Sequence, residues 1–491
     1  MSRSAYEERR LAREVVGPAR AVAFGASNVA PSAAVVGGLV LVVSYAGFAS
    51  PLVVLIAFAA SLCCASSIAE FARRLPSAGS LYTFNSHGLG RIGGFLTGWM
   101  MIFAYALYVP AGISLTSAFV SRLLADTLHV GVADWALSLI VLGAVVLVAY
   151  LGISTSSWVD LVLVTGETAV FAALAITILV KVGPAHYTAS VFSPASSPSG
   201  LSAIARGMIY GITAFAGYEA AAALGEEAKD ARRSIPASTI GVVIAVGAFY
   251  LLVVVAEMSA LGRHGIPGFL HQSSPMGYLA GRFWSSSVLW AVDLVVVVTG
   301  LGFVIAACNV VIRVVFAMGR ERALPESLAR LSKRYTPVVA IGGIAVLSLL
   351  LGFPLTYIYS GARAFGYLAG AAGLSIVLLY LALNMATIRA FRTEFRDDFR
   401  LWRHLLVPAT AAILLLFPLW GILHPRTHRL VDLLPYAALA WLCIGAVTAA
   451  ALWARRPAGL QALGRVFLPA EDAECRHPGR PGVEANPPPI R

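Results

Sequence analysis

Twelve long apolar stretches, separated by short polar segments, run along this chain of 491 residues. A helix needs about 20 apolar residues to cross the hydrocarbon core of a bilayer, and the stretches are close to that length or longer. The pattern therefore predicts an all-α polytopic membrane protein with about twelve transmembrane helices. The expected spans are 21–48, 51–71, 93–120, 135–151, 157–180, 201–224, 238–261, 288–318, 338–353, 365–388, 405–423 and 433–453.

Two of these stretches are interrupted in the middle, where a membrane helix should be continuous. The first carries Pro31 among small polar residues, and the sixth carries Gly211, Gly217 and the ionisable Glu219. Backbone groups released by a break need other partners, so breaks survive only inside protein or around a watery cavity. A pair of interrupted segments at matching places in two halves indicates the binding site of a transporter. The two stretches are five helices apart, which fits a five-plus-five repeat.

The chain divides into one membrane domain with short tails. Residues 1–20 form a polar, Arg-rich lead, and 21–388 hold the ten helices of the repeat. Residues 389–455 add two accessory transmembrane helices outside the repeat. The tail 456–491 is rich in Pro, Gly and charge, and we expect it to be disordered.

Composition and charge support a membrane protein and exclude a soluble one. The chain is 59% hydrophobic and only 12% charged, with a mean hydropathy of +0.81. Most of the 36 Lys and Arg residues fall on the side that holds both termini, so the positive-inside rule predicts cytoplasmic termini and a multi-pass protein of the cell membrane. The net charge of +12 thus reflects topology and contact with the lipid bilayer. Nucleic-acid binding is not expected, because no basic face carries a recognition element.

No motif in the sequence indicates catalysis, a cofactor or a bound metal. The five cysteines have no metal-ligand spacing. The phosphate-binding loop motif and the nucleophile motif Gly-x-Ser-x-Gly are absent from the sequence. We therefore expect neither an enzyme nor an ATP-driven pump, and the expected energy source is a gradient of an ion or a substrate.

Three parts of the chain resemble the amino acid–polyamine–organocation (APC) superfamily of transporters. They are 70–82 with 94–99, then 215–219 with 226–227 and 232–236, and finally Asn309 and Arg313 with 319–325. They follow the family's order and extend over most of 21–388. The resemblance implies an amino acid permease with a five-helix inverted repeat, a substrate site between the breaks of helices one and six, and alternating access.

The first break departs from the family pattern. Family members often break here at a Gly-Ser-Gly-like run whose bare backbone amides hold a substrate carboxylate. The corresponding run in this chain is Ser27-Asn28-Val29-Ala30-Pro31-Ser32. Proline has no N–H, so one amide donor is lost, and three side chains of the run offer donors instead. We expect this run to bind an amino acid or a related small amine, the alternative being a simple proline kink.

The second break supplies the other candidate binding residues. A carboxyl at mid-membrane depth is expensive and usually faces the bundle interior or a cavity. Glu219 is therefore expected to bind a substrate amine or take up a proton, unless it only bonds to a neighbouring helix backbone. The residues expected to contact or cover the substrate, or alternatively to serve packing, are Phe215, Ala216, Gly217, Tyr218 and, on the third helix, Tyr105.

A further acid, Glu167, lies well inside the fifth stretch. A buried carboxyl can act as a proton carrier, so Glu167 and Glu219 are the candidate proton-coupling residues. In some proton-coupled family members a Lys occupies what looks like the position of Glu167. The alternative for Glu167 is a hydrogen bond to a Ser or Thr of the first helix. Asp160, Glu257 and Asp293 are expected at the membrane interfaces.

Charged residues on the predicted cytoplasmic side form a candidate gate. Ion pairs that close the inside of an outward-facing state are expected from Arg73, Arg74, Glu226 and Glu227. The alternative is that the arginines only signal topology.

The sequence thus predicts a secondary active transporter that imports an amino acid or a small amine together with protons. An exchanger of the same family is the main alternative. A ligand sensor without transport and a channel are less favoured, because no signalling domain is recognisable and the chain encloses its own site. The identity of the substrate and the oligomeric state are not determined by the sequence.

Overall fold

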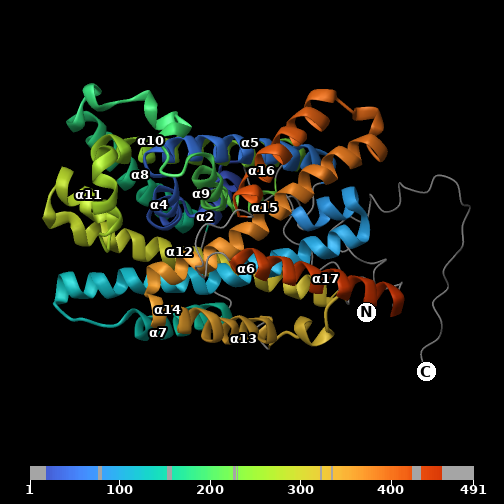
Figure 1. Ribbon diagram of the computed structural model, residues 1–491. Coiled ribbons are helices and arrows are strands. Elements are labelled where there is room, and N and C mark those ends of the chain that lie inside the picture. Colours follow the sequence, from blue (N-terminus) through green and yellow to red (C-terminus); the bar gives the residue numbers. More distant parts are fainter. Residues whose placement is uncertain are drawn as a thin grey trace, which may run out of the picture.

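The computed structural model describes residues 18–75, 80–151, 157–224, 228, 230–320, 323–332, 336–422 and 433–455. These residues are almost entirely helical and contain no strand (Figure 1). Among them, nine helices are long and apolar enough to cross a membrane. One of the nine, Phe24–Arg74, covers the second predicted span and nearly all of the first. The broken sixth span is not counted, and the last contributes only the shorter Tyr436–Leu452. The chain is therefore a multi-pass membrane protein, and the number twelve stays a prediction.

The helices have the following bounds. The α-helices are α2 (Pro18–Val29), α3 (Pro31–Ala33), α4 (Val40–Ala46), α5 (Ser50–Arg74), α6 (Ser80–Leu128), α7 (Asp134–Leu151), α8 (Ser157–Val182), α9 (Gly200–Phe215), α10 (Ala231–Leu270), α11 (Pro275–Phe283), α12 (Leu289–Arg320), α13 (Val338–Leu347), α14 (Phe353–Tyr359), α15 (Gly361–Thr393), α16 (Val407–Ile422) and α17 (Leu434–Arg455). The π-helical turns are η1 (Ala34–Leu39), η9 (Ser348–Gly352) and η11 (Trp402–Leu406), and the tighter turns are η2 (Gly47–Ala49), η3 (Pro184–His186), η4 (Ala189–Phe192), η5 (Pro194–Ser196), η6 (Tyr218–Leu224), η7 (Ser286–Val288), η8 (Glu326–Ala329) and η10 (Arg396–Asp398).

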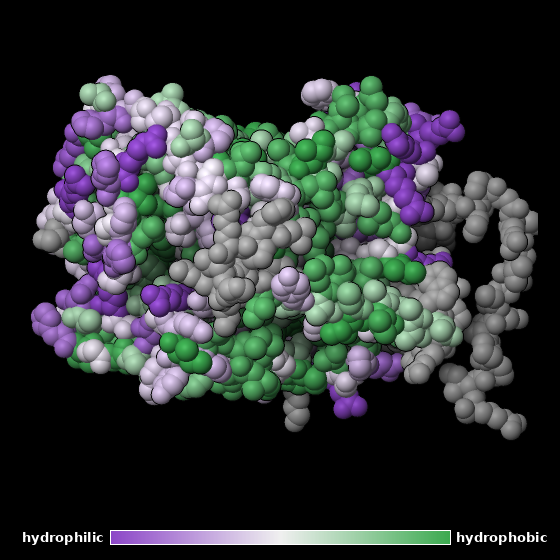
Figure 2. Space-filling model, viewed as in Figure 1, coloured by the Kyte–Doolittle hydropathy of each residue, from purple (hydrophilic) through white to green (hydrophobic). Residues whose placement is uncertain are grey.

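The helices pack in layers (Figure 1). α6 packs along α12 and α15 through the middle of the molecule, with α7, α13 and α14 on one side. α5, α9, α10 and α16 pack together on the other side. Figure 2 shows hydrophobic residues across much of the middle, and hydrophilic residues gathered toward the left and upper right ends. This distribution suits helices that run between two aqueous faces.

The first predicted break is present at Ala30. α2 ends at Val29, Ala30 has the left-handed backbone angles φ 49 and ψ 65, and Pro31 begins the next helical turn. Proline suits a first helical position, because its φ is preset and the missing N–H would have no intrahelical acceptor there. The turn Ala34–Leu39 is π-helical before α4 continues to Ala46. The first span thus consists of two half-helices separated at Ala30.

The second predicted break is present at Ala216 and Gly217. α9 ends at Phe215, Ala216 has φ −55 and ψ 138, and Gly217 has φ 116. Glycine adopts such a positive φ without the steric penalty that a Cβ atom would cause. The tight turn Tyr218–Leu224 follows.

The two accessory helices pack on different parts of the protein. α16 contacts α5, α9 and α15, whereas α17 contacts α6 and α15. The rings of Trp99 on α6 and Trp441 on α17 stack with their centroids 4.6 Å apart. Each indole N–H donates to the backbone carbonyl of the other residue, at 2.8 and 2.9 Å. This reciprocal pair anchors α17 to α6.

Candidate functional site

The two breaks lie directly against each other. A Cβ atom placed on Gly217 would lie 2.4 Å from the carbonyl oxygen of Asn28 and 2.9 Å from the backbone nitrogen of Val29. Both distances are too short for a real Cβ contact, and the atoms met are backbone atoms that cannot swing aside. Only glycine therefore fits here without displacing the first break from the second.

Glu219 is held beside this contact by three hydrogen bonds. The Tyr105 hydroxyl donates to Oε1 at 2.7 Å, and the Tyr380 hydroxyl donates to Oε2 at 2.8 Å. The backbone N–H of Gly217 also donates to Oε2, at 2.9 Å. The side chain is only 3% exposed, and both of its oxygens are already paired. In this conformation Glu219 joins the second break to α6 and α15, and its predicted contact with a substrate amine stays a prediction.

A small cavity lies beside the two breaks. Its volume is about 50 Å³, and its walls come from both half-helices of the first span and from α6, α9, α12 and α15. Ligand pockets usually measure about 300–1,000 Å³, so this space admits a few water molecules but no amino acid. The site is contracted in this conformation.

The cavity brings together part of the predicted binding set. Its lining includes Asn28, Val29, Ala30, Tyr105 and Ala216. One amide donor of Asn28 is engaged with the carbonyl of Phe24 at 2.8 Å. The first break thus reaches the cavity through Asn28, Val29 and Ala30.

The other predicted binding residues lie behind the cavity wall. The Ser27 hydroxyl donates to a carbonyl within its own helix, and Pro31 and Ser32 are buried. The ring of Phe215 stacks on Phe58 at 6.0 Å, and the ring of Tyr218 packs against Tyr380 at 5.5 Å. Both aromatic rings pack against other rings in this conformation and neither lines the cavity, so their contact with a substrate stays a prediction.

The sequence did not single out several residues that line the cavity. Thr213, Phe303 and Phe365 belong to it, and Tyr108 of α6 lines it as well. The hydroxyl oxygens of Tyr108 and Thr213 are buried without a hydrogen-bond partner in the described structure. The two phenylalanines stand in uninterrupted apolar helices, so no local signal distinguishes them from residues that face lipid or core.

Glu167 on α8 lies against α12. The hydroxyl of Thr299 is hydrogen-bonded to Oε2 of Glu167, and it also lies 2.8 Å from the carbonyl oxygen of Val295. The partner therefore belongs to the eighth span, whereas the sequence suggested the first. A threonine hydroxyl has one proton to donate, so it cannot donate to both oxygens at once. The protonation of Glu167 consequently decides in which direction this bond runs.

The arginines of the candidate gate have partners close by. Arg73 pairs with Glu70 at 2.5 Å, and Arg74 pairs with Asp398 of the turn that follows α15. The acids at 226–227 lie outside the described residues. The gate stays a prediction. In this conformation Arg73 makes its ion pair within the last turn of α5, and Arg74 joins α5 to the turn that follows α15.

Two of the acids expected at the interfaces are fully buried within the protein. Asp293 on α12 lies 3.0 Å from Nε of Arg122 on α6 and accepts a hydrogen bond from Ser274 at 2.9 Å. Neither carboxyl oxygen of Glu257 has a hydrogen-bond partner in the described structure. The side chain of Asp160 lies outside the described residues. Asp293 therefore joins α6, α12 and the residue that caps α11.

The fold is similar to that of a solved transporter. The crystal structure of the manganese transporter of Eremococcus coleocola matches 94% of this chain and 97% of its own, with a TM-score of 0.58 and 11% sequence identity. At this identity the likeness shows the fold alone. Among the described residues, no group of three or more His, Cys, Asp or Glu is placed to hold a metal ion.

Sequence comparison places the chain in a family. The branched-chain amino acid permease BcaP of Lactococcus lactis is 26% identical over 386 residues, which cover 73% of this chain and 78% of that protein. An uncharacterized transporter of Mycobacterium tuberculosis is 31% identical over 285 residues, or 56% of this chain and 58% of that one. Human cationic amino acid transporter 4 is 27% identical over 373 residues, covering 70% and 50%. The family profile described as amino acid permease matches residues 19–447. This chain therefore belongs to the amino acid permease family, within the APC superfamily that its motifs resemble.

Proposed function

We propose that this permease is a secondary active transporter that imports an amino acid with an uncharged, apolar side chain, together with a proton. The observation that carries the proposal is the cavity beside the contact of the two breaks. Its residues come from half-helices and helices far apart in the chain, and it offers both polar groups and apolar walls. Transporters bind their substrates at such discontinuous helices.

The polar groups beside the cavity suit the amino and carboxyl groups of an amino acid. The amides of Ser32 and Ala33 open a half-helix and have no intrahelical acceptor, and this positive helix end favours a carboxylate. The hydroxyls of Ser32, Tyr108 and Thr213 are buried and have no hydrogen-bond partner among the residues that the structure describes. An unpaired buried hydroxyl costs about 1–3 kcal/mol, which a bound substrate would recover.

The apolar walls favour an apolar substrate side chain. Val29, Phe303 and Phe365 contribute them, and a methylene group transferred from water to such surroundings contributes about 0.8 kcal/mol. Among the described residues that line the cavity, none carries a carboxyl that could attract a cationic side chain, and both oxygens of nearby Glu219 are already hydrogen-bonded. The branched-chain amino acid permease among the relatives agrees with this choice.

The contracted cavity corresponds to a closed stage of alternating access. An amino acid enters only when the two breaks move away from α6 and α12. The bonds from Glu219 to Tyr105 and Tyr380 cross this boundary, since the second break carries Glu219 while α6 and α15 carry the tyrosines. We infer that these bonds form and break as the cavity closes and opens.

Glu167 is the proton carrier that the geometry favours. The two oxygens of Glu219 accept hydrogen bonds from three donors, whereas the carboxyl of Glu167 has one hydrogen-bond partner among the described residues, the hydroxyl of Thr299. Ionised Glu167 accepts a hydrogen bond from the hydroxyl of Thr299. Protonated Glu167 donates to Thr299, which then donates to the carbonyl of Val295. Proton uptake thus changes the bond between α8 and α12.

Uptake into proteoliposomes tests this function. A panel of radiolabelled amino acids is offered with and without an inward pH gradient, to the wild type and to Glu167→Gln. The glutamine keeps the size and a hydrogen bond to Thr299, but its amide does not ionise and so cannot take up and release a proton during transport. We expect gradient-driven accumulation of apolar amino acids by the wild type, and only gradient-independent counterflow in the variant.

Three outcomes would contradict parts of the proposal. Accumulation that survives in Glu167→Gln would remove Glu167 from the coupling. Uptake that ignores a protonophore but rises with internal substrate would make the protein an exchanger. Binding of an amino acid without any accumulation or counterflow would favour a sensor over a carrier.

A further inference from the structure

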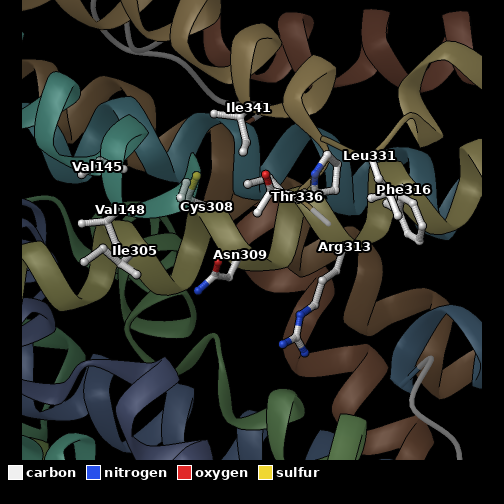
Figure 3. Close-up of a pocket in the computed structure, with 13 residues that line it drawn as sticks. Val145, Val148, Ile305, Cys308, Asn309, Arg313, Phe316, Leu331, Thr336 and Ile341 are labelled. Atoms are coloured by element: carbon white, nitrogen blue, oxygen red, sulfur yellow. The ribbon is translucent and has the colours of Figure 1, made fainter. Parts of the chain in front are cut away.

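A second, larger cavity lies beside the C-terminal half of α12. Its volume is about 410 Å³, and α7, α12, α13 and the segment before α13 line it (Figure 3). It is distinct from the cavity at the breaks, with which it shares no lining residue. Its size falls within the range of about 300–1,000 Å³ that is usual for ligand pockets.

Two polar side chains of α12, Asn309 and Arg313, line this cavity. They are four residues apart and so lie on the same face of the helix. Figure 3 shows both projecting to one side of α12, away from Thr336 and Ile341. Both are exposed, and neither has a hydrogen-bond or ion-pair partner within the described ranges. An unpaired arginine on a membrane-spanning helix is expensive unless it faces a watery path, which makes it a candidate functional group.

The face of α12 that carries these two side chains continues to the cavity at the breaks. Phe303 and Ala306 line that cavity, and Asn309 and Arg313 follow at spacings of three and four residues. At 1.5 Å per residue, Phe303 and Arg313 are about 15 Å apart along the helix. One stripe of α12 therefore leads from the substrate cavity toward the membrane face at which α12 ends, which the charge distribution predicts to be cytoplasmic.

We propose that Asn309 and Arg313 form a second binding site, or station, for the transported amino acid. This station holds the carboxylate of the amino acid on its way between the cavity at the breaks and the cytoplasm. A guanidinium binds a carboxylate through two parallel N–H···O bonds, and the amide of Asn309 adds a third donor. The station rests on the proposed function, because it requires a substrate with a carboxylate. The positive charge of Arg313 stabilises that carboxylate once the substrate leaves the helix end at the first break.

Transport measured separately from the two membrane faces tests the station. Right-side-out and inside-out vesicles from cells that express the full chain give one KM for each face. Arg313→Gln should raise the KM from the face at which α12 ends by about tenfold, because it removes a charge-assisted pair of hydrogen bonds. The KM from the opposite face should change less than about twofold, since Arg313 does not line the cavity at the breaks. Arg313→Lys keeps the charge but not the planar fork, and should give an intermediate KM.

Arg320→Gln is the matched control. Arg320 is on the same helix, and its guanidinium lies 5.9 Å over the ring of Phe316. Its replacement removes the same charge near the same membrane face, outside the cavity lining, and should leave both KM values unchanged. Should Arg313→Gln fail to reach the membrane, Asn309→Ala carries the test, with an expected rise of about threefold at the same face.

The outcomes separate this station from the proposed function. A wild type that transports no amino acid from either face overturns both. A wild type that transports from both faces, with an unchanged KM in Arg313→Gln, overturns only the station. An equal rise at both faces, or the same rise in Arg320→Gln, also overturns it, because the effect would then be general.

Discussion

The substitution Gly217→Ala tests the contact between the two breaks. Gly217 has φ 116, and an added Cβ atom would lie 2.4 Å from the carbonyl oxygen and 2.6 Å from the carbonyl carbon of Asn28. Neither neighbour is the tip of a flexible side chain. Alanine therefore either strains the second break or pushes it away from the first.

The size of the effect follows from these two penalties. A residue with a side chain in a sparsely populated backbone region costs about 1–3 kcal/mol. An extra methyl group in a packed interior typically costs about 1–3 kcal/mol more. The sum is about 2–6 kcal/mol, and 2 kcal/mol alone corresponds to about a thirtyfold change in an equilibrium constant. We expect the conformation with both breaks in contact to lose at least that factor in population.

Amino acid uptake into proteoliposomes measures this loss, with the melting temperature of the purified protein as a check on folding. Gly241→Ala is the control, because a Cβ atom on this helical glycine of α10 has no heavy atom within 4 Å. The control should transport like the wild type, since alanine is favoured over glycine in a helix by about 0.5–1 kcal/mol. Uptake by Gly217→Ala within a factor of two of the wild type would refute the direct backbone contact.

Two further substitutions test separate contacts. Tyr380→Phe removes one donor from the buried carboxylate of Glu219, which costs about 1–3 kcal/mol and should slow uptake about tenfold; unchanged uptake in proteoliposomes would contradict the role of this bond in closing the cavity. Trp441→Ala removes the stacked ring and one of the two reciprocal hydrogen bonds with Trp99, together about 1–3 kcal/mol. It should lower the melting temperature and leave the KM unchanged, and an altered KM at an unchanged melting temperature would argue against a purely anchoring role for α17.

The breaks could be predicted because they depend on the chain itself. Pro31 lacks an N–H wherever it stands, and Gly217 is the residue type that tolerates a positive φ. Both act on their own helix, so a single sequence displays them. That the breaks touch, with the backbone of Asn28 against Gly217, depends on how two spans pack and could not be derived locally.

The role of Glu219 shows where sequence reasoning ends. Its position within an apolar span indicated a buried carboxyl with a purpose, and it is 3% exposed. Its partner Tyr380 is 161 residues away, in a span that the sequence did not connect with it. Phe303 and Phe365 of the cavity wall were missed for the same reason.

The sequence by itself determined that this chain is a helical membrane protein of the amino acid permease family, and where its helices are interrupted. Hydropathy, proline and glycine act over a few residues, so the order of the residues is sufficient to predict them. Only the tertiary structure decided which groups meet at the breaks, and that Glu167 bonds to Thr299, a residue 132 positions further along. Contacts between distant helices depend on packing across the whole bundle, because each side chain can bond only to groups that folding brings within about 3 Å.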